Sequence, residues 1–392
     1  MTKVYIDITQ FMQINALTGI QRVMRELMVR MLKSDELETI LIFYDHQARK
    51  YRLVDREKML RYLDQNWGRK LDTYATVQIE IEDLEPGSVF FEIDVAWSAK
   101  LKRSYLLPLL KKQGLILVSM IYDIMAITHY QYFHPYFTFE FMEFIGAHVR
   151  YDDLIIVNTH PSEQYLIDFS RELGVSHIRT EVVPLGGDFQ GQDNSPSSPD
   201  DVQEKIRRIA DRKKYILLVG TLEPRKNHKL VYEAFRKEGL CNENINVIFA
   251  GRTGWIEKGF LKKLYADKDF GRRIYHIKDA TNADLNYLYH HAFVVAFPTH
   301  MEGYGLPVVE ALQNGAVTVV SDIDVLREVG GDACVYFRQN SAKDFAEKVS
   351  ALMRNPKEYQ RLRNLAAAYS PFTWDEATEK VIQALTKAKE EK

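Results

Sequence analysis

Residues Phe293–Gln313 read FVVAFPTHMEGYGLPVVEALQ, and this segment indicates the class of fold. It starts with an unbroken apolar run, passes through a turn that contains Gly303 and Gly305, and ends in apolar residues at helical spacing. An apolar run without polar alternation predicts a strand covered on both faces, as in a parallel sheet. Pro307 suits the first position of a helix, where its missing N–H is not needed. The segment therefore predicts a strand–turn–helix unit of an open α/β sheet.

Similar apolar runs follow one another along both halves of the chain. Besides a helix at Gly19–Leu32, the first half predicts strands at Lys3–Ile8, Thr39–Tyr44, Ser88–Glu92, Leu115–Tyr122 and Leu154–Asn158. The second half predicts further strands within Lys214–Gly220, Asn246–Gly251 and Ala316–Asp322. Strands separated by helices imply right-handed crossovers and a parallel sheet, whose ligands bind at the carboxyl ends of the strands. We therefore expect two mostly parallel α/β sheets.

The boundary between the two sheets lies in a polar segment. Gly191–Asp201, GQDNSPSSPDD, is rich in Ser, Pro and Asp and has no large apolar residue, which is typical of a linker. We predict a Rossmann-like domain over 1–189, a linker over 190–213, a second Rossmann-like domain over 214–367 and a terminal segment over 368–392. The two domains are expected to face each other across a cleft.

Composition excludes several classes of protein. In 392 residues, 52 Lys and Arg stand against 54 Asp and Glu, a net charge of −2 that argues against nucleic acid as a partner. An apolar fraction of 46% supplies ample material for packed cores, and two cysteines cannot form a disulfide framework. The N-terminus has no secretory leader pattern, and no apolar run reaches the roughly 18 residues of a membrane span. We expect a cytoplasmic protein.

The turn within His300–Gln313 has the residues of a ligand site. Gly303 and Gly305 let the backbone approach a ligand closely, and a helix N-terminus favours phosphate. Seven residues separate Glu302 from Glu310, so we expect Glu310 in the first helical turn and both carboxylates facing one cleft. Carboxylates accept hydrogen bonds from paired hydroxyls, which suits sugar and ribose rings. The alternative is an ordinary helix cap with solvated acids.

A second turn, GTLEPRKNH at Gly220–His228, follows the first strand of the second half. Arg225 offers a planar fork and Lys226 a point charge, and together they can neutralise a pyrophosphate. Stabilising a departing nucleotide diphosphate is the electrostatic task in glycosyl transfer. A solvated basic turn is the alternative.

These segments resemble the nucleotide-sugar glycosyltransferases of family 4, which have the two-domain GT-B fold. The family's hallmark is a Glu, seven residues and a second Glu, in a context close to EGYGLPVVE, and a late F-[ST]-W-[DE] element matches Phe372–Asp375. The resemblance makes the first domain the acceptor domain and the second the nucleotide-sugar domain. It implies that Trp374 begins a helix that crosses back onto the first domain.

The resemblance also implies roles for single residues. Glu310 would bind the ribose hydroxyls, Glu302 would contact the donor sugar, and Arg225 with Lys226 would hold the diphosphate. Donor contacts would also come from the glycine-rich turn formed by Gly303, Tyr304, Gly305 and Leu306.

In the first half the resemblance is carried by Leu17–Leu27, LTGIQRVMREL, where Gly19 would let a helix N-terminus approach the donor phosphate. Tyr122 stands where many relatives have a histidine that touches the donor sugar; its hydroxyl can donate one hydrogen bond but cannot be a cation near pH 7. Asp123 would orient the acceptor hydroxyl or take its proton, or it would cap the next segment.

Two segments bear on partners. Lys100–Lys112 carries five basic residues around a leucine-rich face, and Tyr130–Phe144 contains eight aromatic residues. Together they would lie in a membrane interface or cover a lipid-linked acceptor. A core helix with a solvated basic face, followed by an acceptor loop, is the alternative.

The expected activity is that of a retaining glycosyltransferase, without cofactor or metal, that builds a bacterial surface polysaccharide such as O-antigen. Its partners would be a nucleotide-sugar donor, with GDP-mannose first, dTDP-rhamnose second and UDP-sugars third, and a glycan or lipid-linked acceptor. Peripheral association with the inner face of the membrane is left open. Three other functions on the same fold also remain open: a sugar phosphorylase, a nucleotide-sugar epimerase and an inactive sugar-nucleotide-binding subunit.

Overall fold

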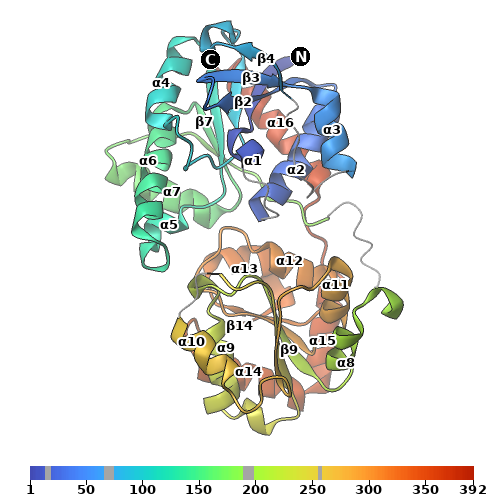
Figure 1. Cartoon of the computed structure of the whole chain (residues 1–392). Coiled ribbons are helices and arrows are strands. Elements are labelled where there is room, and N and C mark those ends of the chain that lie inside the picture. Colours follow the sequence, from blue (N-terminus) through green and yellow to red (C-terminus); the bar gives the residue numbers. More distant parts are fainter. Residues whose placement is uncertain (14–18, 66–74, 189–197, 255–257) are drawn as a thin grey trace. The chain divides into compact units, whose positions relative to one another are not determined.

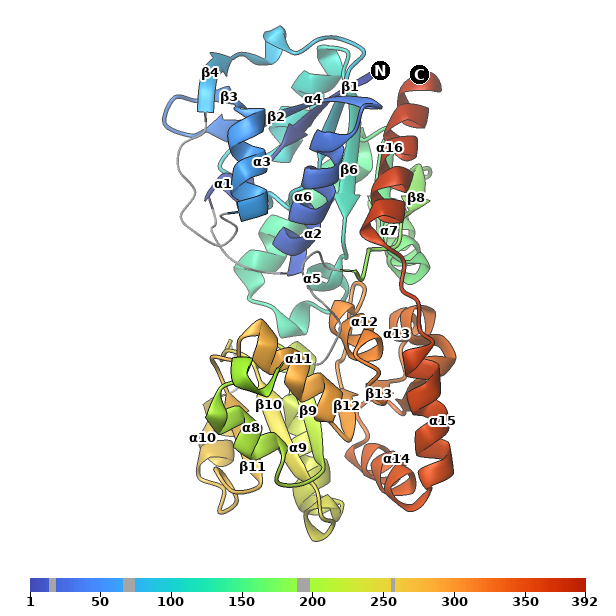
Figure 2. The same ribbon diagram turned by 90° about the vertical axis from the view of Figure 1, so that its right-hand side faces the viewer.

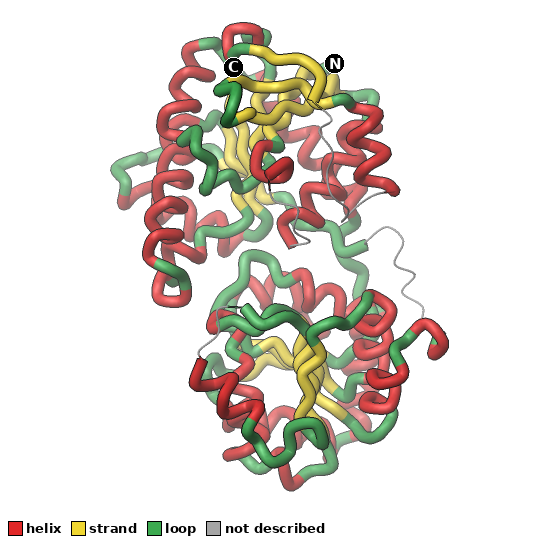
Figure 3. Tube along the Cα trace, viewed as in Figure 1, coloured by secondary structure: helices red, strands yellow, loops and turns green. Residues whose placement is uncertain are grey.

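The structure is a computed structural model of the whole chain, and it describes residues 1–13, 19–65, 75–188, 198–254 and 258–392. The chain forms two compact units, one of Met1–Phe189 with Phe372–Lys392 and one of Gln190–Pro371. Figures 1 and 2 show both units from two sides, and in each of them helices cover both faces of a central sheet (Figure 3). The predicted α/β class with two mostly parallel sheets is confirmed.

The first unit is built on one sheet, whose described strands follow the order β4-β3-β2-β1-β5-β6-β7-β8. Its strands are β1 (Thr2–Asp7), β2 (Leu37–Asp45), β3 (Lys50–Val54), β4 (Ala75–Ile79), β5 (Val89–Glu92), β6 (Ile116–Ile121), β7 (Leu154–Val157) and β8 (Thr180–Val182). Strand β3 pairs antiparallel with β2 and β4, while the other pairs are parallel. The chain extends the sheet in one direction from β1 and in the other from β5, so the topological switch point lies between them.

The helices of this unit are α1 (Thr9–Gln13), α2 (Gly19–Lys33), α3 (Arg56–Gln65), α4 (Arg103–Lys112), α5 (Met125–Thr128), α6 (Pro135–Tyr151), α7 (His160–Glu172) and α16 (Trp374–Glu390). Helix α2 shows why they form: Val23, Met24, Leu27 and Met31 recur at helical spacing and are all buried. The helix ends with Arg30 and Lys33 in its last turn, where positive charge complements the helix dipole.

Helix α16 closes the first unit although it comes last in the sequence. It packs against α2, β1 and β6. Trp374 at its start is fully buried, and its backbone N–H donates to Asp188 Oδ1 at 2.6 Å. A Cβ at Gly186 would lie 2.5 Å from the Trp374 ring, so a glycine is needed beneath the indole. The first unit therefore depends on both ends of the chain.

The second unit has a parallel sheet, whose described strands follow the order β11-β10-β9-β12-β13-β14. These are β9 (Tyr215–Val219), β10 (Asn246–Ala250), β11 (Ile274–Ile277), β12 (Val294–Phe297), β13 (Thr318–Ser321) and β14 (Cys334–Phe337). Its helices are α8 (Glu204–Ala210), α9 (His228–Lys237), α10 (Lys258–Tyr265), α11 (Asn282–His291), α12 (Leu306–Gln313), α13 (Asp324–Gly330), α14 (Ala342–Arg354) and α15 (Pro356–Ala367). The switch point lies between β9 and β12.

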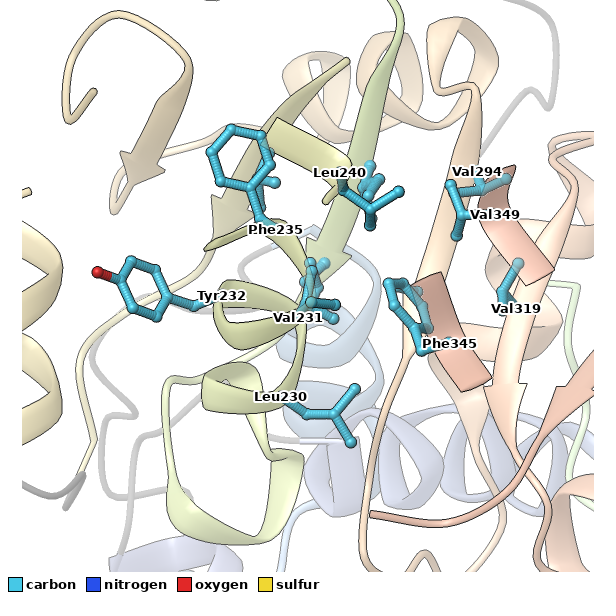
Figure 4. Close-up of a cluster of buried hydrophobic side chains, with 14 of the residues drawn as sticks. Leu230, Val231, Tyr232, Phe235, Leu240, Val294, Val319, Phe345 and Val349 are labelled. Atoms are coloured by element: carbon cyan, nitrogen blue, oxygen red, sulfur yellow. The ribbon is translucent and has the colours of Figure 1, made fainter. Parts of the chain in front are cut away.

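Both faces of this second sheet are buried, as the unbroken apolar strands predict. On one face Val231 and Phe235 of α9 pack with Phe345 and Val349 of α14 against the strands (Figure 4). On the other, Leu312 of α12 and residues of α8 and α11 complete a second cluster. Each strand therefore contributes side chains to two cores, and the polar residues that could bind ligands lie beyond the strand ends.

The structure differs from the sequence prediction in the segment 190–213. Residues 190–197 lie outside the described residues, but α8 follows, and Val202, Ile206 and Ala210 are buried in the second unit. These residues thus belong to the core of the second unit rather than to a linker. Their apolar residues recur every four positions, a helical spacing that the neighbouring Ser, Pro and Asp residues obscured.

Candidate active site

The loops after β9 and β12 flank the switch point of the second sheet, and they are joined to each other. The His300 N–H donates to the Arg225 carbonyl at 2.9 Å, and Thr299 Oγ1 donates to the same carbonyl at 3.1 Å. The His300 carbonyl in turn accepts from Gln339 Nε2 at 2.6 Å. The carboxyl ends of these strands are where an open α/β sheet binds its ligand. The predicted motifs at 220–228 and 300–313 therefore form one site.

The loop after β10 also belongs to this edge, although it was not assigned to the site from the sequence. Gly251 has φ +156°, and a Cβ there would lie 2.0 Å from the Gly220 carbonyl oxygen. The Leu222 N–H donates to the Arg252 carbonyl at 2.8 Å, and Gly254 N–H donates back to Leu222. The glycine in NVIFAG is the sequence signal for this close approach, which holds the Arg225 loop in place.

Glu302 lies between the two predicted cations. Its Oε1 is 2.5 Å from Lys226 Nζ and 3.0 Å from Arg225 Nη1, and its side chain is 8% exposed. Arg225 also donates to Glu223 Oε1 at 2.7 Å and to the Met301 carbonyl at 3.1 Å. The structure therefore brings Arg225, Lys226 and Glu302 together, as a compact group in which two cations face two carboxylates.

Burial and charge determine the protonation of this group. Burial would raise the pKa of Glu302, but Arg225 and Lys226 lower it to about 2. Burial lowers the pKa of Lys226, and Glu302 offsets part of that shift. His228, next but one in sequence, has its pKa lowered to about 3 by burial and by Lys226, so it is neutral at pH 7. The site thus keeps Glu302 ionised, with Arg225 and Lys226 as its counter-ions.

The glycine-rich turn ends at the N-terminus of α12. Gly305 is the N-cap residue with φ +96°, and a Cβ there would lie 2.8 Å from Leu326 Cδ2. Pro307 is the second residue of the helix, one place after the predicted first position. Tyr304 and Leu306 flank Gly305 and are half-buried. The turn therefore directs the positive end of a helix toward the switch point, where it can stabilise a phosphate.

Glu310 is not in the first turn of α12, where the sequence interpretation placed it. The helix begins at Leu306, so Glu310 lies in its second turn. Its Oε2 accepts from the Tyr289 hydroxyl at 3.2 Å. The helix starts at Leu306, one residue before Pro307, so Glu310 is its fifth residue and lies just beyond the first turn.

In the first unit the predicted residues follow β1 and β6. Gly19 is the first residue of α2, next to residues 14–18 that are not described. A Cβ there would meet no atom of the described residues within 4 Å. The described part of the chain therefore shows no close contact that would require a glycine at this position.

Tyr122 and Asp123 have contacts within their own unit. The Tyr122 hydroxyl donates to the Ile93 carbonyl at 3.0 Å, and the ring is 5% exposed. While this hydrogen bond is made, the Tyr122 oxygen could only accept from a donor sugar, and could not donate to it. Asp123 Oδ1 accepts from the Met125 N–H at 2.9 Å, which is the capping contact considered as an alternative.

A buried ionic network lies at the same edge of the first sheet and was not predicted. Arg103 donates to Glu92 Oε2 at 2.7 Å and to Asp7 Oδ2 at 2.9 Å. His148 Nδ1 lies 2.9 Å from Asp152 Oδ2, and its Nε2 lies 3.4 Å from Glu92 Oε2, an ion-pair distance rather than a hydrogen bond. Asp7 and Glu92 end β1 and β5, so the network fixes the two strands beside the switch point.

The aromatic segment of the first unit is partly exposed. Tyr130, Tyr136, Phe139 and Met142 are exposed, while Phe137 and Phe141 turn inward and stack at 5.7 Å. Helix α4 packs on α6, and its Lys102 pairs with Glu140. In the described residues we find no helix with the length and apolar character needed to cross a bilayer.

Comparison with protein families identifies the second unit. Residues 200–369 match the family of glycosyl transferases group 1. The match spans both loops of the site, including Arg225, Lys226, Glu302 and Glu310. It begins just before α8, consistent with the packing of that helix in this unit.

Curated relatives extend the similarity to the first unit. The chain is 23% identical over 392 residues to the serotype-specific mannosyltransferase WbdA of Escherichia coli, covering 98% of this chain but 46% of that protein. It is 25% identical over 177 residues to the O-antigen chain mannosyltransferase RfbU of Salmonella typhimurium, covering 45% of this chain and 47% of that protein. The chain thus spans less than half the length of these relatives.

Among solved structures, HepE of Anabaena in complex with UDP has a TM-score of 0.69 at 13% identity and covers 99% of this chain and 100% of its own. At this identity the likeness concerns the fold alone, and it agrees with the two parallel-sheet bodies expected of GT-B proteins. Residues 200–369 are a glycosyltransferase group 1 domain, in a chain of the GT-B fold that is homologous to the O-antigen mannosyltransferases.

Proposed function

We propose that this chain is a retaining glycosyltransferase that moves a hexose from a nucleotide diphosphate sugar to a bacterial surface glycan or its lipid-linked precursor. The observation that carries the proposal is the placement of Arg225, Lys226 and Glu302 beside the N-terminus of α12. Cations and a helix end at one point suit a diphosphate, and a carboxylate beside them suits the sugar hydroxyls.

The departing diphosphate would take over the cations that Glu302 now binds. Arg225 and Lys226 would neutralise the charge that develops on the leaving group, and the α12 N-terminus would add to this stabilisation. The acceptor oxygen would attack on the face from which the diphosphate leaves, which retains the configuration. Because two side-chain cations serve the phosphates, we propose that transfer needs no divalent metal.

Mannose from GDP-mannose is the first donor to test, because the relatives WbdA and RfbU are named mannosyltransferases. A dTDP-sugar is the second. A UDP-sugar is the third, and the solved HepE structure is a complex with UDP. Glu310 would bind the ribose in each case, so its removal should weaken all nucleotides.

The experiment is a donor-binding and turnover assay on the purified chain. We expect one nucleotide to raise the thermal midpoint of the wild type, and Glu310→Ala to abolish that shift. Glu302→Gln should bind nucleotide but lower turnover at least 100-fold. Loss of turnover with a chelator and its recovery with manganese would contradict metal independence. Binding without any turnover would instead indicate an inactive sugar-nucleotide-binding subunit.

Gly19→Ala separates a ligand contact from a structural role. Since a Cβ at Gly19 meets no atom within 4 Å, we expect unchanged thermal stability. The donor KM should rise at least tenfold if the donor phosphate lies against this backbone. An unchanged KM would remove Gly19 from the site.

We propose that the acceptor is presented at a membrane surface. The exposed side chains Tyr130, Tyr136, Phe139 and Met142 support this, because amphipathic aromatic residues favour the membrane interface. Flotation with anionic vesicles should fall for Phe139→Ser and stay constant for Phe260→Leu, a buried control in the second unit. If both variants float with the vesicles equally, the proposal of a membrane-bound acceptor is wrong, and a soluble glycan is the acceptor to test.

A further inference from the structure

A cavity of about 370 Å³ lies in the second unit, at the opposite edge of the sheet from the candidate active site. It is lined by residues just before β9 and β12, namely Lys214 and Phe293, together with the end of α11 and the first turns of α15. The candidate site lies after the same two strands. Strands of this length separate the two edges by roughly 15 Å, so the cavity is a distinct place in the fold.

All the ionisable cavity residues except a tyrosine are basic. They are Lys214, His290, His291 and Arg363, and the described residues that line the cavity include no aspartate or glutamate. Among the described residues, Lys214 and Arg363 take part in no ion pair. This differs from Arg236, Lys237 and Arg361 in the same unit, each of which pairs with a carboxylate. Lys214 and Arg363 therefore bring positive charge to a hollow whose described lining has no carboxylate.

The cavity also has a fixed aromatic wall. Phe293 and Tyr359 stack at 4.7 Å with an interplanar angle of 2°, and the Tyr359 hydroxyl donates to the Phe293 carbonyl at 2.9 Å. Lys214 Nζ lies 4.7 Å from the centre of the Phe293 ring, which holds the ammonium group at the wall. Pro356, at the start of the twelve-residue helix α15, lies at the same place, so the positive end of that helix adds to the field.

We propose that this cavity binds a phosphate-bearing anion, a phosphate monoester or a pyrophosphate group, through Lys214, Arg363 and the two histidines. Arginine matches a phosphate with two parallel hydrogen bonds, and lysine adds a point charge. His291 can donate from Nε2 when protonated, because its Nδ1 lies 2.9 Å from the Tyr287 carbonyl. The proposal does not depend on the function of the other edge.

The test uses inorganic pyrophosphate and the full-length chain. Isothermal titration compares the wild type with Lys214→Ala/Arg363→Ala and with the matched control Lys213→Ala/Arg361→Ala. The control removes the same charge from neighbouring positions of the same two segments, neither of which lines the cavity. We expect the dissociation constant of the cavity site to rise at least tenfold in the first variant and less than twofold in the control. The conservative variant Lys214→Arg, which keeps the positive charge, should bind pyrophosphate as the wild type does.

Hydrogen exchange locates the bound anion, since pyrophosphate can also occupy the proposed donor site. Protection over residues 286–293 and 352–366 would report the cavity, whereas protection over 220–226 and 299–306 would report the donor site. The two proposals can thus fail separately. Vesicles of phosphatidylglycerol, compared with phosphatidylcholine, test whether the phosphate belongs to a lipid headgroup. If the double variant and its control bind pyrophosphate and anionic vesicles equally, the proposal is wrong.

Discussion

Glu302 and His148 are both buried and charged, and each is kept charged by its neighbours. Burial favours the neutral form of either group, but Glu302 has two cations within 3.0 Å and His148 lies between two carboxylates. The two cations lower the pKa of Glu302 to about 2. At His148 burial lowers the pKa, but Asp152 and Glu92 outweigh burial and raise it to about 9. Glu302 lies in the proposed donor site, whereas His148 belongs to a buried ionic network of the first unit.

The His148 network predicts a pH dependence of stability in the alkaline range. Because the folded pKa of about 9 exceeds the ordinary value of 6.5, the stabilisation is fully present below pH 6.5 and is lost as the pH rises through 9. The loss is about 3 kcal/mol in the free energy of unfolding. Urea unfolding of the first unit at pH 6, 7.5 and 9.5 measures it. Asp152 and Glu92 face the imidazole, and the Ser119 hydroxyl donates to Asp152 Oδ2.

His148→Gln is the control for this prediction. It should be less stable at pH 6, because it leaves the buried Asp152 without its cation and leaves Glu92 with Arg103 alone. Its stability should then change little between pH 6.5 and 9. A parallel decline in the wild type and the variant would show that another group is responsible.

Single residues differ in how well the sequence predicts their roles. Arg225, Lys226 and Glu302 could be predicted to share a site because each follows a recognisable strand, and such strand ends meet at one edge of a sheet. The contact of Arg103 with Asp7 joins residues 96 positions apart and has no local signal. The Tyr122 hydroxyl lies at a strand end too, but a neighbouring backbone carbonyl is its partner. Position at a strand end therefore predicts proximity to a site, but not the direction of a side chain.

Helix α12 is bounded by two left-handed glycines, and they allow its two ends to be tested separately. Gly305→Ala should destabilise the chain by about 2 kcal/mol more than Gly315→Ala, because both have a positive φ but only Gly305 has a neighbour within 3 Å of the new Cβ. Gly315, with φ +64°, has open space around it. Urea unfolding of both variants measures the difference.

The same pair of variants tests the link between the turn and the ligand. Gly305→Ala should weaken nucleotide binding, because it moves the N-terminus of α12 away from the proposed phosphate position. Gly315→Ala at the far end should bind nucleotide as the wild type does. Equal affinities in the two variants would indicate that the glycine-rich turn serves only to start the helix.

The strands that the sequence predicts well are those that are buried on both faces of their sheet. The central strands β1, β5, β6, β9, β10, β12 and β13 are apolar on both faces and matched the predicted ranges within a few residues. The outer strands β3, β4, β8, β11 and β14 were not predicted. These strands either pair with only one other strand or carry both polar and apolar side chains, as the exposed Glu181 in β8 illustrates. Their sequences therefore do not differ clearly from the sequences of loops. Helix α8 was missed because its polar flank resembles a linker.

The chain as a whole forms two units, but only the second is continuous in sequence. The first unit requires Phe372–Lys392, so a sequence boundary drawn at the polar segment near 190 describes the second unit better than the first. Helix α16 provides the missing cover for α2, β1 and β6. A chain that lacks this helix would expose those surfaces in the first unit and leave the second core intact.

Trp374→Ala tests this dependence in the full-length chain. Trp374 is fully buried, and a large-to-small change at such a site costs about 3–5 kcal/mol. The cavity would lie within the first unit, so hydrogen exchange should accelerate in β1, β5 and β6 and remain unchanged in β9, β10 and β12. Phe345→Ala, which removes a fully buried ring from the second core, should produce the opposite pattern. Faster exchange in both units for either variant would mean that the two units unfold together, and that α16 stabilises the entire chain rather than the first unit alone.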